Sequence, residues 1–249
     1  MTTPDPRLAA RYAGTRTSAA EYDAGLRSYM IGIYNYMLTG LAVTGFVAYG
    51  LSMLLIDQAT GQPTQLMMTL FGSPLKWLVM LSPFAFILVL SFGIQRLSSQ
   101  MAAMLFFAFS AVMGVSLSTI FLAYTGTSIA QVFFITAGVF GAMSLWGYTT
   151  KRDLTSMGSF LFMGLIGIVI ASIVNMFLNS DALGFAISII GVLVFTGLTA
   201  WDTQRLRDYY EAGMNGELQA KTSVMGALSL YLNFINLFLM LLSLLGNRE

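Results

Sequence analysis

Cysteine and histidine are both missing from the 249-residue sequence, and charged residues make up only 9% of it. Without cysteine there are no disulfides and no thiolate ligands. Without histidine there are no imidazole metal ligands and no Ser-His or Cys-His nucleophilic pair. A soluble domain carries about a quarter charged residues, so this chain lies far outside the soluble range. The formal net charge of +1 gives no indication of nucleic-acid binding.

Hydrophobic residues, by contrast, make up 57% of the chain, and the mean hydropathy is +0.76. Runs of roughly 20 apolar residues recur, each long enough to cross a bilayer of about 30 Å hydrocarbon thickness. We therefore expect an all-α polytopic membrane protein, a seven-transmembrane-helix bundle. The predicted spans are Tyr29–Ile56, Trp77–Ile94, Met101–Tyr124, Ile129–Tyr148, Gly158–Leu178, Leu183–Thr203 and Val224–Leu245.

The first 27 residues are polar and contain no apolar core of the signal-peptide type. We interpret residues 1–27 as a flexible cytoplasmic N-terminal arm and residues 28–249 as the transmembrane domain. Two of the connections between spans are long. Residues 57–76 contain several glycines and prolines, and residues 204–223 are polar and charged. The other connections are short, so neighbouring helices are expected to be antiparallel.

Lysine and arginine are distributed very unequally between the two expected sides of the membrane. One side holds ten, and the other holds only Lys76 and Arg248. Because cytoplasmic loops carry the excess of basic residues, the N-terminus is predicted to be cytoplasmic and the C-terminus outside. The ten are Arg7, Arg11, Arg16, Arg27, Arg96, Lys151, Arg152, Arg205, Arg207 and Lys221.

One acidic residue, Asp202, falls inside a predicted span, near the cytoplasmic end of the sixth. Placing a charge within a membrane span costs several kcal/mol of free energy unless the charge is paired or in contact with water. Asp202 is therefore a candidate functional residue. Arg96 ends the second span at a similar depth, and we predict a charge-assisted pair between the two. In the seventh span Asn233 and Asn236 share one helix face.

Several enzyme classes can be set aside from the residues alone. The three lysines, Lys76, Lys151 and Lys221, all lie at span ends, which leaves none in mid-helix for a retinal Schiff base. An intramembrane aspartyl protease needs two carboxylates, and the spans contain one. No glycine-rich loop of the phosphate-binding type is present. We therefore expect a protein that is not an enzyme and that needs no cofactor.

Four stretches of the chain resemble the Bax inhibitor-1 family, also called the transmembrane Bax-inhibitor-motif family, in its bacterial branch. They lie in order over about residues 24–248, and the last two are the more specific. The stretches are GLRSYMIGIYNYMLTGLAVTGFVAYG, FFAFSAVMGVSLSTIF, FTGLTAWDTQRL and GALSLYLNFINLFLMLLSLLGNR.

The resemblance implies a seven-helix bundle with the last helix central, acting as a pH-sensitive calcium leak. In the family, aspartates of the sixth and seventh helices share a proton, and an arginine at the end of the second helix latches onto the first of them. Asp202 matches the first aspartate and Arg96 the arginine. The second aspartate is replaced here by Asn233, which cannot titrate and offers Ca²⁺ a neutral oxygen. Tight Ca²⁺ binding at Asp202 is therefore not expected. If the sixth and seventh helices meet as in the family, Asn233 is expected to donate a hydrogen bond to the Asp202 carboxylate.

Two functional hypotheses follow from the resemblance. The first is a calcium or cation leak channel in the inner (plasma) membrane, with Asp202 and Asn233 as the ion-binding and pH-sensing positions and Arg96 with Asp202 as the latch. The second is a membrane interaction protein that regulates a membrane-bound protease or another partner through its N-terminal arm. The expected partners are the lipid bilayer, Ca²⁺ or H⁺, and a membrane protein, with no nucleic acid.

The charge asymmetry generates a topology prediction. A reporter fused after Arg207 should face the cytoplasm, and a reporter fused after Glu249 should not. Paired cytoplasmic and periplasmic reporter fusions measure this. Finding both fusions on one side would remove either a span or the predicted orientation.

Overall fold

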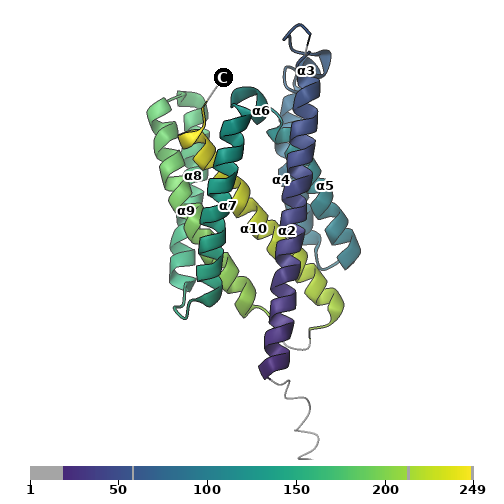
Figure 1. Ribbon diagram of the computed structural model, residues 1–249, viewed down its shortest axis with the longest axis vertical. Helices are drawn as coiled ribbons and strands as arrows, with labels where there is room; N and C mark the ends of the chain where they lie inside the picture. The colour runs from purple at the N-terminus through teal and green to yellow at the C-terminus, as the bar shows by residue number, and fades with distance from the viewer. Residues whose placement is uncertain (1–18, 58, 212–213, 248–249) are drawn as a thin grey trace, which may run out of the picture.

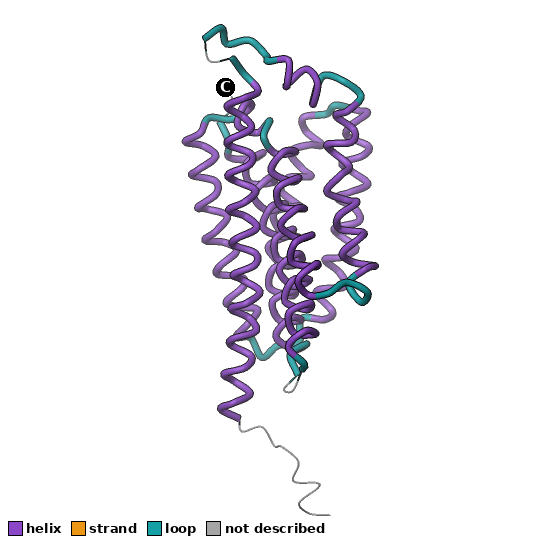
Figure 2. The backbone as a smooth tube through the Cα atoms, turned by 90° about the vertical axis from the view of Figure 1, so that its right-hand side faces the viewer, coloured by secondary structure: helices purple, strands orange, loops and turns teal. Residues whose placement is uncertain are grey.

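The structure is a computed structural model that describes residues 19–57, 59–211 and 214–247. Within these ranges it is almost entirely helical, and the one β-bridge joins Ile56 to Pro63. The long helices run side by side, with the connections gathered at the two ends of the bundle (Figure 2). The helices are α2 (Ala19–Leu55), α3 (Gln65–Leu70), α4 (Leu75–Gly93), α5 (Ser99–Leu117), α6 (Ile120–Ala123), α7 (Gly126–Thr149), α8 (Thr155–Leu178), α9 (Asp181–Asp208) and α10 (Gly216–Leu245).

Seven helical segments of the described chain are long and apolar enough to cross a membrane, which confirms the predicted fold class. Six of them are single helices, and the third span, Ser99–Ala123, combines α5 with α6. The ends differ from the expected ones where polar residues continue a helix beyond its apolar stretch. Thus α9 continues to Asp208 and α10 begins at Gly216, and the polar connection between them shortens to 209–215.

Part of the expected N-terminal arm belongs to the bundle. Residues 1–18 lie outside the described residues, whereas 19–27 form the first turns of α2. In these turns Leu26 is buried, and the ring of Tyr22 meets that of Tyr210 edge to face, with centroids 5.4 Å apart. The start of α2 is therefore held against the region that joins α9 to α10.

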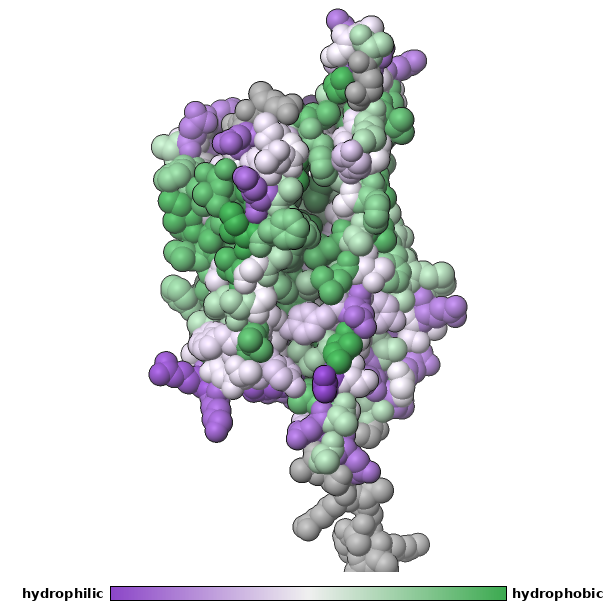
Figure 3. All heavy atoms as spheres, viewed as in Figure 1, coloured by the Kyte–Doolittle hydropathy of each residue, from purple (hydrophilic) through white to green (hydrophobic). Residues whose placement is uncertain are grey.

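The outer surface of the bundle is strongly apolar. Phe46, Phe92 and Phe177 are each at least 75% exposed, and many other large hydrophobic side chains point outward. Figure 3 shows hydrophobic residues covering the middle of the molecule and hydrophilic ones gathered toward its ends. A contiguous apolar surface of this extent marks contact with lipid, so the chain is an integral membrane protein.

Basic residues gather at the end of the bundle where α2 starts and where α4, α7 and α9 end. We call this the basic end. Lys76, near the start of α4, belongs to the opposite end, and Arg248 lies outside the described residues. The described basic residues of the basic end are Arg27, Arg96, Lys151, Arg152, Arg205, Arg207 and Lys221.

The last helix is the centre of the bundle, as the family resemblance implies. It crosses diagonally between the other helices (Figure 1) and packs against α9, α2, α7 and α5. Its most apolar stretch is 56% buried, against 11–39% for the other six spans. Any path through the interior of this bundle must therefore run along α10.

Polar side chains inside the bundle are matched with partners across helices. The Tyr231 hydroxyl of α10 lies 2.6 Å from Thr44 Oγ1 of α2, and Thr44 Oγ1 donates to the Ser110 carbonyl of α5 at 2.8 Å. Because the Thr44 proton is used on that carbonyl, Tyr231 is the donor to Thr44. Such bonds join helices that have no hydrophobic driving force between them in lipid.

Close helix contact at the basic end depends on one glycine of α7. A Cβ at Gly147 would lie 2.2 Å from the Ala200 carbonyl oxygen of α9, a distance that backbone cannot accommodate. Glycine therefore allows the backbones of α7 and α9 to touch. This contact lies beside the residues that follow Ala200 on α9, which form the site described below.

Candidate functional site

Asp202 lies inside the bundle, on the face of α9 that packs against α10. The whole residue is 4% exposed, and it lies about 9 Å before the end of α9, at a rise of roughly 1.5 Å per residue. The predicted span ends at Thr203, directly after Asp202, whereas α9 continues to Asp208, so Asp202 lies further from the helix end than expected. A buried carboxylate requires a paired cation and hydrogen-bond donors to offset its lost hydration.

Two side chains of α10 supply donors to one oxygen of Asp202. Ser229 Oγ and Asn233 Nδ2 each donate to Asp202 Oδ2 at 2.7 Å. They are four residues apart, so they project from the same face of α10 on successive turns. The expected hydrogen bond from Asn233 to Asp202 is therefore present. The amide nitrogen faces the carboxylate, which accepts hydrogen bonds and donates none.

Arg205 supplies the charge that balances Asp202. Its Nη2 lies 2.7 Å from Asp202 Oδ1, one turn further along α9, and 3.4 Å from Ser229 Oγ. Its guanidinium also stacks over the Trp201 ring at 4.7 Å, which holds it in place. We call Asp202, Arg205, Ser229 and Asn233 the Asp202 cluster.

A cavity of about 760 Å³ reaches the Asp202 cluster from the basic end. Its walls come from α2, α4, α9 and α10, and they include Arg205 and Ser229. The Arg205 side chain is 49% exposed, whereas that of Asp202 is 6% exposed. Arg205 therefore stands between the cavity and the carboxylate.

Neighbouring side chains hold the end of α9 in place. Gln204 donates to the Arg152 carbonyl at 2.7 Å and accepts from the Leu154 amide at 2.8 Å. Arg207 donates to the Tyr148 carbonyl at 2.6 Å and to the Thr150 carbonyl at 3.2 Å. These bonds tie α9 to the α7–α8 connection, so the cluster is built on a fixed helix end.

The predicted pair between Arg96 and Asp202 is wrong. Arg96 is exposed in the turn after α4, and no ion pair joins it to Asp202 in the described structure. There are two physical reasons. Arg205 lies on the same helix as Asp202 and already pairs with the carboxylate. In addition, the cavity separates α4 from the cluster, and it is Gln95 and not Arg96 that lines this cavity.

Asn236 does not join the cluster either. Its Nδ2 donates to the Leu232 carbonyl of its own helix at 2.8 Å. No group of three or more acidic, histidine or cysteine side chains that could hold a metal ion occurs in the described ranges. Ca²⁺ takes 6–8 oxygen ligands. Asp202 Oδ2 already accepts two hydrogen bonds, and Oδ1 forms an ion pair with the Arg205 guanidinium although it accepts no hydrogen bond, so the residues present do not fit a resident Ca²⁺ site.

Sequence reasoning missed two members of the cluster, Ser229 and Arg205. Helical spacing could have predicted both. Ser229 lies four residues before Asn233 and shares its helix face, and Arg205 lies three residues after Asp202 and shares its helix face. From the sequence Arg205 counts only among the basic residues of one side, because the predicted span ends at Thr203. In the structure α9 continues to Asp208 and therefore includes Arg205.

The profile of the family described as "Inhibitor of apoptosis-promoting Bax1" (Bax1-I) matches residues 26–249. That range includes every described member of the Asp202 cluster and all but the first turns of α2.

Similar proteins occur in several bacteria. The protein RP147 of Rickettsia prowazekii is 48% identical over 96% of this chain and 98% of its own length. The inner membrane protein YbhL of Escherichia coli K12 is 48% identical over 91% and 94%. An uncharacterized membrane protein of Streptococcus pyogenes is 36% identical over 91% and 96%.

The pairing within the cluster predicts which arginine couples to Asp202. Arg205→Gln should destabilise the protein in the presence of Asp202 and much less in an Asp202→Asn background, because the cation then has no buried carboxylate to balance. The expected coupling is about 1 kcal/mol, within the range for side chains in contact. Thermal or denaturant unfolding of the four proteins in one detergent measures it.

Arg96→Gln is the matched control, since it removes an arginine from the same end of the bundle. Its effect and that of Asp202→Asn should add without coupling. If instead the effects of Arg96→Gln and Asp202→Asn are coupled, and those of Arg205→Gln and Asp202→Asn simply add, then Asp202 pairs with Arg96 in solution and not with Arg205.

Proposed function

The chain belongs to the Bax inhibitor-1 family of membrane proteins, and on that premise we propose that it is a cation leak channel that passes Ca²⁺, rather than an enzyme. The observation that carries the proposal is Asp202, a buried carboxylate on the central contact between α9 and α10, whose partners Arg205 and Ser229 line a cavity. An ionisable residue inside a membrane span is a hallmark of an ion pathway.

The geometry supports separate roles for the members of the Asp202 cluster. Asp202 supplies the negative charge that makes a cation favourable at this depth. Arg205 forms an ion pair with Asp202 from the cavity side. In the described state, therefore, a cation cannot reach the carboxylate from the cavity unless Arg205 moves away. The hydrogen bonds from Ser229 and Asn233 hold the carboxylate of α9 against α10. Opening then requires Arg205 to leave Asp202 Oδ1, which its half-exposed position allows.

Asn233 bears on the pH response. Two carboxylates that share a proton titrate as a coupled pair, and one of them then changes charge in a range that cells experience. An amide at position 233 gives Asp202 a hydrogen-bond donor and no proton to share. We therefore propose a leak with little pH sensitivity and weak Ca²⁺ binding.

We further propose that the basic end faces the cytoplasm. The excess of lysine and arginine at that end supports this orientation. The cavity beside Arg205 would then open to the cytoplasm, and a cation would reach Asp202 from there without crossing lipid. The names of two relatives describe membrane proteins, one of them of the inner membrane.

The test is Ca²⁺ flux into liposomes that contain the purified chain, measured between about pH 5 and 8, the range in which one proton of a carboxylate pair moves. The chain should give a nearly level flux. Asn233→Asp should give a flux that changes several-fold over this range, together with tighter Ca²⁺ binding, because it adds the second carboxylate.

Asp202→Asn serves as the control, since it keeps the shape of the side chain and should abolish Ca²⁺ selectivity at every pH. A steep pH response of the unaltered chain, with Ca²⁺ bound as tightly as by Asn233→Asp, would defeat the account. No Ca²⁺ flux from either protein would reject the channel itself.

The same assay separates the alternative, a regulator that acts on a partner through its N-terminal arm. Deletion of residues 2–18 stops before α2 and keeps the packing of Tyr22 and Leu26. The channel account expects the flux to survive this deletion. Loss of flux on deletion would favour a function that resides in the arm.

A further inference from the structure

A second cavity, of about 560 Å³, lies between α2 and α7, away from the cavity that reaches Asp202. Most of its lining is apolar, and Phe234 of α10 closes its deep side. Ile31, Leu38 and Leu145 of the lining are exposed on the outer surface, so the cavity is a groove open toward the lipid. We call it the α2–α7 groove.

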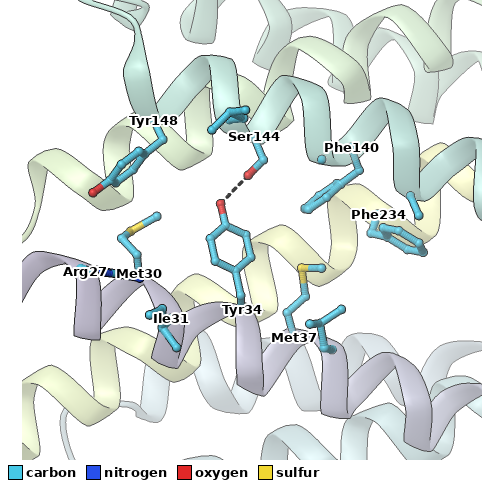
Figure 4. A pocket seen from close by; sticks show the side chains of 13 residues that line it. Arg27, Met30, Ile31, Tyr34, Met37, Phe140, Ser144, Tyr148 and Phe234 are labelled. Carbon is cyan, nitrogen blue, oxygen red and sulfur yellow. Dashed lines mark hydrogen bonds between the residues drawn. The ribbon is translucent and has the colours of Figure 1, made fainter.

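The two ends of the α2–α7 groove differ in chemistry (Figure 4). Arg27, Met30 and Tyr148 lie at one end, and Met37, Phe140 and Phe234 at the other. The guanidinium of Arg27 makes no ion pair in the described part of the chain. The groove therefore combines an apolar channel with an unpaired cation at its mouth.

The position of Arg27 matches the boundary of the hydrocarbon layer. It stands beside Tyr148, at the end of α7, where the chain leaves the span. From Arg27 to Leu38 the groove follows α2 for roughly 16 Å, at about 1.5 Å per residue. That length is close to half of a hydrocarbon core of about 30 Å, the depth to which one leaflet reaches.

A polar bridge crosses the groove part of the way along. Tyr34 of α2 donates to Ser144 Oγ of α7, and Ser144 in turn donates to Thr203 Oγ1 of α9 at 2.9 Å, since Thr203 uses its own proton on the Thr199 carbonyl at 2.8 Å. The bridge joins α2 to α7 and ends next to Asp202. An occupant that packs on Tyr34 would act on the element that carries the Asp202 cluster.

We propose that the α2–α7 groove binds one anionic membrane phospholipid, with an acyl chain along the apolar part and the phosphate at Arg27. Charge complementarity favours an anionic lipid, since a Lys or Arg near the membrane surface attracts anionic headgroups. The apolar lining and the lateral opening favour a chain that never leaves the bilayer. A bound lipid would fill the space between α2 and α7 and stabilise the closed arrangement of the bundle.

The test uses the full chain, purified in detergent and mixed with phosphatidylglycerol or phosphatidylcholine of equal chain length, with bound lipid counted by native mass spectrometry. The chain should retain one phosphatidylglycerol and prefer it over phosphatidylcholine. Arg27→Gln should reduce that preference by about fivefold, the contribution expected of one arginine near an anionic surface. Lys151→Gln, another exposed basic residue of the same end, should leave the preference unchanged.

A second pair of variants blocks the groove. Gly141 lines it, and a Cβ at this position meets nothing within 4 Å, so Gly141→Phe can fill the groove without displacing a helix. Gly138 of the same helix is equally open and lies outside the lining, which makes Gly138→Phe the matched control. Gly141→Phe should lose the bound lipid, and Gly138→Phe should keep it.

Retention of the lipid by Gly141→Phe, at the level of Gly138→Phe, would overturn the proposed location. If Arg27→Gln and Lys151→Gln prefer phosphatidylglycerol over phosphatidylcholine to the same extent, the role of Arg27 is overturned and only a general attraction to the basic surface is left. Equal retention of phosphatidylcholine and phosphatidylglycerol by the unaltered chain would overturn the anionic lipid as occupant. Folding of each variant is checked by its melting temperature, which neither glycine substitution should lower by more than a few degrees.

Discussion

A single carboxylate inside the membrane sets the arrangement of this protein's interior. Asp202 needs a cation and hydrogen-bond donors around its carboxylate, because an uncompensated charge at that depth costs several kcal/mol. One partner lies on its own helix and two lie on α10, so the requirement fixes how the two helices face each other. The central position of α10 follows from the same requirement, since the helix that satisfies Asp202 cannot be displaced to the lipid.

The sequence predicted those features that depend on periodicity and on the cost of burial. The seven spans followed from apolar length, and Asp202 stood out as an acid where acids are costly. The contact of Asn233 with Asp202 came from the family resemblance and proved correct. The Arg96 pair failed because equal depth in the membrane gives no information on the face of a helix or on a cavity between helices. Ser229 and Arg205 were accessible through helical spacing, but only once the ends of α9 and α10 were known.

Two cavities give the bundle two different surfaces for interaction. The one beside Arg205 lies at the basic end and reaches Arg205, the cation that is paired with Asp202. The α2–α7 groove opens to the side and is apolar for most of its length, as a lipid site is. The hydrogen bonds from Tyr34 of the groove lead through Ser144 to Thr203, the residue that follows Asp202. Lipid and ion would thus act on the same segment of α9.

The central claim is that Arg205 closes the path by occupying Asp202, and Ca²⁺ flux through Arg205→Gln in liposomes tests it most directly. This change frees the carboxylate while it keeps a polar side chain of similar length. We predict a resting leak several-fold above that of the unaltered chain, and no increase for Arg96→Gln. A leak of Arg205→Gln that equals or falls below the unaltered chain, or an increase found with Arg96→Gln instead, would contradict the account.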